Sequence, residues 1–373
     1  MAMQIRNQRL KGLIAVALIC ITLMSVGASE KSFALSQVTI NGAGSSFVFP
    51  LLDTWRVAYQ KVHPNVNINY QSIGSGGGVK QFTAKTVDFG ASDAPLNAQE
   101  RQAAAGAVQI PETIGSVAVA YNIPGIPTKT LKFTGPVLAD IFQGKITKWN
   151  DPQIKALNPG VNLPDANIVV VHRSDGSGTT YVWTSYLSRE SPSWNQTIGA
   201  SKSVPWPTGI GAPGSEGVAK TIKSSPNTIG YVELDYALTK GIPFALVKNP
   251  TGNFIEPSLD STQDAVSNAV ALNSLPAGDK SWTKVSMLKA PGPKSYPIAS
   301  FTYLLLCKEM SANPNIDQTK AKTLVDFISW AITDGQKFAA DLGYVPLPAR
   351  VVTGDQDTLR LLTFKGAPLY TGP

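Results

Sequence analysis

The chain has 373 residues, enough for one large domain or two domains of ordinary size. Its composition is 43% hydrophobic and 15% charged, with 32 Gly and 27 Pro. This excludes a fibrous or disordered protein and favours a loop-rich α/β fold over a helical bundle. The net charge of +7 is mild, and no cluster of Lys and Arg interleaved with aromatic residues predicts nucleic-acid binding.

The first 34 residues differ from the rest of the chain. Basic residues at positions 6, 9 and 11 precede an apolar run over residues 12–26, and small residues follow it. This order is typical of a bacterial export signal, cleaved after Ala28 or Ala34. The alternative is an uncleaved membrane anchor, for which the run is short. We therefore expect a periplasmic protein, whose net charge falls from +7 to +4 once residues 1–34 are removed.

Strand and helix patterns alternate after the signal segment. Residues 38–40 and 66–70 are typical of strands, and residues 88–92 form a third short strand. A helix that opens at Pro50 separates the first two strands, and a short helix over residues 79–87 separates the last two. This β-loop-α order predicts a mostly parallel sheet with helices on its faces.

Two longer strand patterns divide the chain into two lobes. Residues 116–121 and 298–306 are candidates for strands that cross between the lobes. One lobe is then expected to contain residues 35–118 and 301–373, and the other residues 119–300.

The second lobe has a strand, loop and helix of its own. The strand covers residues 167–172, the loop residues 173–178, and the helix begins at Thr179. Near the end of the chain, further helices are expected over residues 320–332 and 336–342.

Three loops share one chemical pattern, because each follows a strand, is rich in Gly and hydroxyl residues, and precedes a helix. The first N–H groups of a helix lack partners and carry partial positive charge, so such loops can bind anions. For any one loop the alternative is an ordinary turn with a helix cap. Three such loops in one chain favour an oxyanion site, with the candidate residues Ser45, Ser46, Phe47, Ser75, Ser177, Gly178 and Thr179.

Three charged residues accompany these loops. Arg173 can form paired hydrogen bonds to phosphate-like oxygens, with Asp175 as its partner, although a surface ion pair is the alternative. Asp93 would repel an anion unless that anion carries a proton to donate, as phosphate does and sulfate does not. The alternative for Asp93 is a helix cap before Ala94 and Pro95.

Motifs of enzymes and cofactor sites are missing from the sequence. No phosphate-binding G-x-x-x-x-G-K-[ST] loop and no G-x-S-x-G elbow occurs. Residues 209–214 fit G-x-G-x-x-G by letter, but they follow Pro205-Trp-Pro207 rather than a strand and include Pro213, so we dismiss them as a dinucleotide site. His63 and His172 lack metal-ligand spacing. We expect no catalytic residue, no metal and no cofactor.

Long stretches of the chain resemble the periplasmic phosphate-binding proteins of bacterial phosphate ABC importers. The resemblance covers nearly the whole chain after the signal segment. It implies a periplasmic binding protein type II fold, with two α/β lobes joined by two crossover strands and phosphate bound in the cleft between them. The stretches are NGAGSSFVFP (41–50), YQSIGSGGGVKQ (70–81), VDFGASDAPL (87–96), IFQGKITKWN (141–150) and RSDGSGT (173–179).

The resemblance also implies roles for single residues. The first loop's hydroxyl and N–H fall on Ser46 and Phe47, and the second loop's serine falls on Ser75. The remaining roles are those of the proton acceptor Asp93, the cation Arg173 with its acidic partner Asp175, and the helix-end donors Ser177, Gly178 and Thr179.

The chain departs from the family pattern at three of these positions. Gly76 stands where family members often have Ser, so one side-chain donor is expected to be missing. Ser46 replaces a frequent Thr and keeps the hydroxyl, and His172 stands where a second basic residue often precedes the arginine.

The expected function is binding of inorganic phosphate and its delivery to the membrane subunits of an ABC permease, by a monomer that performs no chemistry. Two alternatives stay open. One is a receptor for another tetrahedral oxyanion, such as sulfate or molybdate, against which Asp93 argues. The other is a secreted phosphoesterase, which would need an activated nucleophile or a metal pair.

Overall fold

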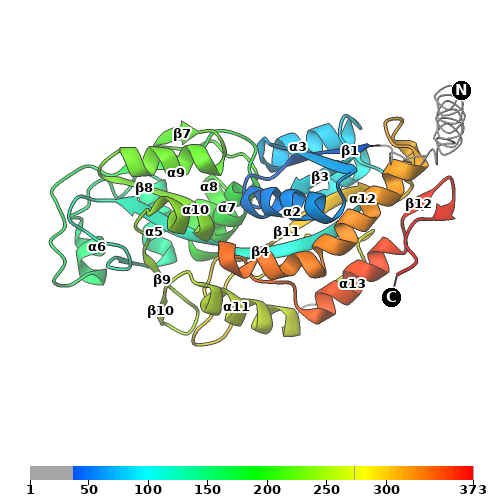
Figure 1. The fold of residues 1–373 in the computed structure, drawn as a ribbon. Coiled ribbons are helices and arrows are strands. Elements are labelled where there is room, and N and C mark those ends of the chain that lie inside the picture. Colours follow the sequence, from blue (N-terminus) through cyan, green and yellow to red (C-terminus); the bar gives the residue numbers. More distant parts are fainter. Residues whose placement is uncertain (1–36, 273, 373) are drawn as a thin grey trace, which may run out of the picture. The chain divides into compact units, whose positions relative to one another are not determined.

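The computed structural model describes residues 37–272 and 274–372, and the predicted export signal over residues 1–34 lies outside them. Most strands form one sheet of eight, in the order β2-β1-β3-β11-β4-β8-β6-β7 (Figure 1). Among the described residues, no helix combines the length and the apolar character that crossing a membrane requires.

The long strand β4, Ala107–Asn122, runs through both halves of this sheet (Figure 1). Its residues up to Ser116 pair with β11, Ala299–Cys307, and its residues from Val117 pair with β8, Thr228–Glu233. The sequence predicted only residues 116–121 of β4. Nearly all of β4 is buried, so its first part has no polar and apolar alternation to reveal it.

The first half of the sheet contains β2, β1, β3, β11 and the start of β4. Its strands β1, β2 and β3 are parallel, and β11 runs antiparallel to β3 and β4, as in a mixed sheet. The elements are β1 Val38–Gly44, β2 Val66–Ser72, β3 Phe89–Ser92, α2 Phe49–Val62, α3 Gly74–Thr83, α4 Ala98–Ala103, α12 Gln318–Ala331 and α13 Ala349–Leu359.

The second half contains the end of β4 with β8, β6 and β7, of which β6 is parallel to both β7 and β8. Its main elements are β6 Val169–Arg173, β7 Ile210–Ala212, α5 Gly135–Phe142, α7 Gly178–Glu190, α9 Gly214–Ser224 and α10 Leu234–Lys240.

Shorter elements complete the described part of the fold. They are α6 Pro152–Leu157, α8 Pro192–Thr197, α11 Leu259–Leu272, a small sheet of β5 Lys132–Phe133, β9 Leu246–Lys248 and β10 Phe254–Ile255, the hairpin of β12 Thr363–Phe364 and β13 Ala367–Pro368, and the 3-10 turn η1 Met310–Ala312.

A β-bulge interrupts the pairing of β4 with β11. Thr302 pairs with Thr113 and Tyr303 pairs with Pro111, so Glu112 is the extra residue. Gln336 holds the bulge, because its amide Nε2 donates to the Glu112 carbonyl oxygen at 2.9 Å. The α-helix predicted over residues 336–342 is wrong, because this segment forms two 3-10 turns, η2 Asp334–Phe338 and η3 Ala340–Leu342.

An aromatic cluster lies beneath the second half and supports its central strands. The rings of Trp183 and Tyr231 stack with their centroids 5.4 Å apart, and both side chains are buried. The Tyr231 hydroxyl lies 2.6 Å from the Thr180 hydroxyl and accepts from the Arg173 backbone N–H at 3.1 Å. Packing in the core thus fixes where β6 ends and α7 begins.

Candidate anion-binding site

The predicted loops meet at the carboxyl ends of the parallel strands. We call the ends of β1, β2 and β3 the first edge, and the ends of β6, β7 and β8 the second edge. In open α/β sheets, ligands bind outside the carboxyl ends of the strands. Side chains from both edges lie in contact here, and the predicted hydroxyl, acid and guanidinium groups of Ser45, Ser46, Ser75, Asp93, Arg173, Ser177 and Thr179 are all at least 97% buried.

At the first edge, two serine hydroxyls converge on one carboxylate. Asp93 follows β3 directly, and its Oδ1 accepts a hydrogen bond from the Ser45 hydroxyl. Its Oδ2 accepts from the Ser75 hydroxyl at 3.1 Å, at the start of α3. Asp93 caps no helix, because the cap of α4 is Asn97. The backbone N–H of Phe47 donates to the Ser45 Oγ at 3.0 Å, which places Phe47 beside the same cluster.

At the second edge, the buried side chain of Arg173 bonds with several neighbouring side chains. The Nε and Nη2 of Arg173 donate to the two carboxylate oxygens of Asp175 at 2.8 and 2.6 Å. Arg173 is only 3% exposed, so this is no surface ion pair. Its Nη1 donates to the hydroxyls of Thr179 at 3.2 Å and Ser215 at 2.9 Å.

The predicted helix-end residues at α7 behave differently from one another. The Ser177 hydroxyl accepts from the Thr180 backbone N–H at 3.1 Å, so this side chain acts as the N-cap of α7. Gly178 lies against the first edge. A Cβ atom on it would stand 2.5 Å from Oδ2 of Asp93 and 2.6 Å from Oγ of Ser75, which leaves room for glycine alone.

Direct contacts join the two edges. The Ser46 Oγ lies 2.9 Å from the Ser215 Oγ and accepts from the Ser215 backbone N–H at 3.0 Å. The Gly76 backbone N–H, at the position where family members often have Ser, donates to the Gly176 carbonyl oxygen at 2.8 Å. The edges therefore stand close enough for a small anion to reach donors of both.

Sequence reasoning missed two residues of this cluster, Ser215 and Glu233. Ser215 is the second residue of α9, shortly after β7, in a fourth strand-loop-helix unit that includes the dismissed G-x-G-x-x-G letters. The Gly-Ser pair after a short strand could have predicted another anion-binding loop, but Pro205 and Pro213 argued against a strand and a helix here. Glu233 ends β8, and its Oε1 accepts from the hydroxyls of Thr179 at 2.6 Å and Ser215 at 3.0 Å. As one acid in a buried strand, it gave no signal in the sequence.

Burial changes the protonation of the acids near the site. It is the main cause that raises the pKa of Asp93 to about 6, against the lowering effects of the Ser45 hydrogen bond and the Arg173 charge. Burial likewise raises the pKa of Glu233. Burial also lowers the pKa of Arg173, but Asp175 and Glu233 outweigh it, so that this pKa lies above its ordinary value.

A cleft of about 580 Å³ opens beside the cluster. Ser46 and Gly214 line it, together with Asp175 and Tyr236, and Tyr236 donates from its hydroxyl to the Ser46 carbonyl oxygen at 3.0 Å. This cleft gives solvent a route toward the two edges.

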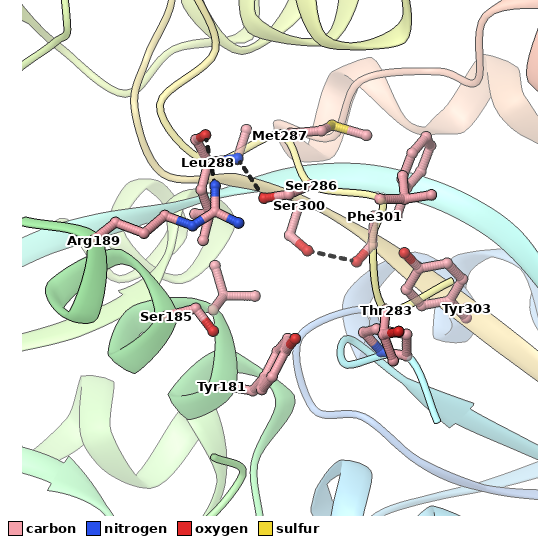
Figure 2. Close-up of a pocket in the computed structure, with 14 residues that line it drawn as sticks. Tyr181, Ser185, Arg189, Thr283, Ser286, Met287, Leu288, Ser300, Phe301 and Tyr303 are labelled. Carbon is pink, nitrogen blue, oxygen red and sulfur yellow. Dashed lines mark hydrogen bonds between the residues drawn. The ribbon is translucent and has the colours of Figure 1, made fainter. Parts of the chain in front are cut away.

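A different, smaller pocket lies between α7 and the start of β11 (Figure 2). Arg189 points toward Leu288 there and donates to its carbonyl oxygen at 3.2 Å. The pocket volume of about 40 Å³ suits a few water molecules. None of the predicted site residues lines it, so the candidate site remains the cluster at the two edges.

Metal coordination is absent from the described part of the chain, where no group of three or more His, Cys, Asp and Glu residues could hold a metal ion. The donors of the site are hydroxyls, backbone N–H groups and one guanidinium. This donor set, with the buried acceptor Asp93 among it, suits a small anion that carries a proton.

Comparison with known proteins identifies the family of this chain. The family model for a PBP superfamily domain matches residues 30–334. The phosphate-binding protein PstS of Pasteurella multocida is 45% identical over 323 residues, which cover 86% of this chain and 90% of that protein. The phosphate-binding protein PstS of Methanocaldococcus jannaschii is 40% identical over 328 residues, which cover 85% of this chain and 84% of that protein.

Solved structures share the fold at lower identity. The phosphate binding protein from Stenotrophomonas maltophilia matches with a TM-score of 0.65 at 20% identity, over 86% of this chain and 93% of that one. The predicted periplasmic binding protein fold is confirmed. The chain belongs to the PBP superfamily and, within it, to the family of the phosphate-binding proteins PstS.

Proposed function

We propose that this protein binds inorganic phosphate between the two edges and delivers it to an ABC-type import permease. The single observation that carries the proposal is the pairing of a buried acceptor, Asp93, with a buried cation, Arg173, inside a set of neutral donors. Its family membership supports the same function, because its relatives carry the name phosphate-binding protein.

Each edge contributes a different kind of contact in this proposal. Arg173 and the N-termini of α7 and α9 donate to the unprotonated oxygens, as do Ser46 and the Phe47 N–H. Asp93 accepts the hydrogen of the phosphate O–H group. Ser45, Ser75 and Gly178 surround that contact, Thr179 lies beside Arg173, and Asp175 holds Arg173 in place.

Selectivity follows from Asp93. Sulfate has no hydrogen to donate at neutral pH and would place an oxygen against a buried carboxylate without a partner, which costs several kcal/mol in a water-poor site. We therefore infer phosphate, rather than sulfate or molybdate, as the ligand.

The wider features of the proposal rest on the family and the sequence. We infer an exported, periplasmic, monomeric receptor that performs no chemistry on phosphate and needs no cofactor. Its lobes would be residues 35–118 with 301–373, and residues 119–300, and phosphate would stabilise the closed arrangement that the permease recognises. The change of pairing partner along β4 at Val117 supports this division.

Calorimetric titration with phosphate, sulfate, arsenate and molybdate tests the proposal. We expect one phosphate per chain, and little competition from sulfate at roughly a hundredfold higher concentration, since about 3 kcal/mol is that factor. Equal affinities for phosphate and sulfate would contradict it. Hydrolysis of p-nitrophenyl phosphate by the purified protein would instead support the phosphoesterase alternative.

A further inference from the structure

Glu233 is a buried acid that directly contacts the site without a role in the proposed phosphate contacts. It ends β8 and is 1% exposed. Its Oε1 accepts hydrogen bonds from the hydroxyls of Thr179 and Ser215, and its Oε2 has no hydrogen-bond partner among the described residues. A carboxyl so placed can control how the neighbouring hydroxyls are oriented.

Ionised Glu233 competes with a bound anion for the hydroxyl hydrogens of Thr179 and Ser215. A hydroxyl has one hydrogen to donate. The oxygens of Thr179 and Ser215 both accept from Nη1 of Arg173, and both hydroxyls donate to Glu233. While Glu233 is ionised, therefore, neither hydroxyl has a hydrogen left for a bound anion.

The charges around Glu233 make its ionised form costly once an anion arrives. Arg173 on β6 is the cation that faces it, and Asp175 already pairs with that arginine. The other titratable groups that interact with it are Asp93 after β3, Asp235 and Tyr236 of α10, and Tyr344. Burial already raises the pKa of Glu233, and an anion beside Arg173 would raise it further.

We propose that Glu233 is a positioning residue that takes up one proton from solvent when phosphate binds, and thereby frees one neighbouring hydroxyl to donate to the ligand. The new O–H of Glu233 donates to the oxygen of Thr179 or Ser215. That hydroxyl then turns its own hydrogen from Glu233 to a phosphate oxygen, while the other hydroxyl still donates to the carboxyl group. The inference rests on the proposed function.

Proton counting by calorimetry tests it. Phosphate is titrated into wild type and Glu233→Gln at about pH 8, in buffers of different ionisation enthalpy, which gives the protons taken up per phosphate bound. We expect wild type to take up roughly one proton more than the variant, whose amide already donates. Between about pH 8 and 9, phosphate affinity should fall up to about tenfold more in wild type than in the variant.

Asp355→Asn is the matched control. It makes the same change of acid to amide at another buried carboxyl, on α13, with no hydrogen bond to the site. Its proton uptake should equal that of wild type. Equal uptake in wild type and Glu233→Gln would overturn the inference while leaving phosphate binding intact. A wild type that binds no phosphate would overturn the proposed function, and the inference with it.

Infrared spectroscopy keeps the inference testable if Glu233→Gln does not fold. The difference spectrum of wild type with and without phosphate should gain the band of a protonated carboxyl group at about pH 8. The band should persist in Asp93→Asn, because it belongs to Glu233. Its absence from wild type, or its loss in Asp93→Asn, would overturn the inference.

Discussion

Each edge of the site holds a buried charged residue, and the residues at the two edges have different partners. At the first edge, Asp93 receives two neutral serine hydroxyls and has no basic partner on its own edge. At the second edge, Arg173 is held by Asp175 and faces Glu233. In the proposed function, the first edge detects whether a ligand carries a hydrogen, and the second edge detects its negative charge. Phosphate meets both requirements.

Each edge also has a buried acid behind it, and the two acids differ in their surroundings. Glu112, at the bulge of β4, accepts from the Thr302 hydroxyl at 3.0 Å, and burial raises its pKa to about 8. The charge of the nearby Asp93 raises the pKa of Glu112 further. Glu233 instead contacts hydroxyls that Arg173 orders. Because Glu112 is mostly neutral at neutral pH, it adds little charge near Asp93. The protonation of Glu233, by contrast, depends on the charge of Arg173.

The largest effect is expected from Arg173→Ala. Removing the buried cation should weaken phosphate and sulfate alike by about a hundredfold or more, roughly 3 kcal/mol, because a buried charged contact to the anion is lost. The order of the two anions should not change. Calorimetry with both anions is the measurement.

Arg189→Ala is the control for this variant, since it removes the same charge at the pocket of Figure 2. It should leave both affinities within about twofold of wild type. A change in the ratio of phosphate to sulfate affinity in Arg173→Ala would mean that the second edge also distinguishes the two anions by something other than charge.

Asp93→Asn should act on selectivity rather than on affinity as a whole. The amide removes the repulsion toward sulfate, so the ratio of phosphate to sulfate affinity should fall by about 1–3 kcal/mol, roughly 5-fold to 150-fold. Phosphate should keep substantial affinity through Arg173 and the helix N-termini. An unchanged ratio would leave Asp93 without a role in selectivity.

The pH dependence of the same ratio sharpens this test. Because the pKa of Asp93 is raised to about 6, its carboxyl group is ionised above that pH and protonated below it. A protonated carboxyl can donate to sulfate, so discrimination should decline as the pH falls through about 6. In Asp93→Asn the ratio should lose this dependence.

The fold and most of the site could be predicted because their signals are local. A strand, a loop of Gly and Ser, and a helix start lie together in the sequence around Ser45, Ser75 and Ser177. The first-edge partners of Asp93 also come from such loops. Packing against the core then brings the loops together, as the sheet order confirms.

The parts that escaped prediction depend on long-range contacts. Ser215 reaches Arg173 from 42 residues away, and the prolines around its loop obscured the strand-loop-helix pattern. Glu233 reaches Thr179 from 54 residues away and lies in no recognisable motif. The predicted helix over residues 336–342 likewise begins at a residue with a distant partner, since Gln336 bonds to the bulge of β4, and the segment forms 3-10 turns instead. Tertiary contacts overrode local propensity in both places.

A smaller effect is expected where the two edges touch. In Gly178→Ala, the added methyl group would collide with Asp93 and Ser75, so the edges must move apart. We expect phosphate to bind roughly tenfold more weakly, on the order of 1–2 kcal/mol, and sulfate to be affected in proportion. Gly354→Ala in α13 is the control, because its Cβ meets nothing within 4 Å and helix propensity favours Ala. Wild-type affinity in Gly178→Ala would show that the ligand does not need this close contact.

The smallest effect is expected from salt. Both edges act through buried side chains and helix N-termini, which dissolved ions screen far less than they screen surface charges. Raising the salt concentration from about 50 to 500 mM should therefore weaken phosphate only a few-fold. A surface alternative exists at α9, where Lys220 and Lys223 line an open pocket with Lys240. If that patch held the anion, affinity would fall steeply with salt, and Lys220→Gln with Lys223→Gln would weaken it further. We expect this double variant to match wild type within about twofold, because the cation that we propose for the ligand is Arg173, which is buried between the two edges.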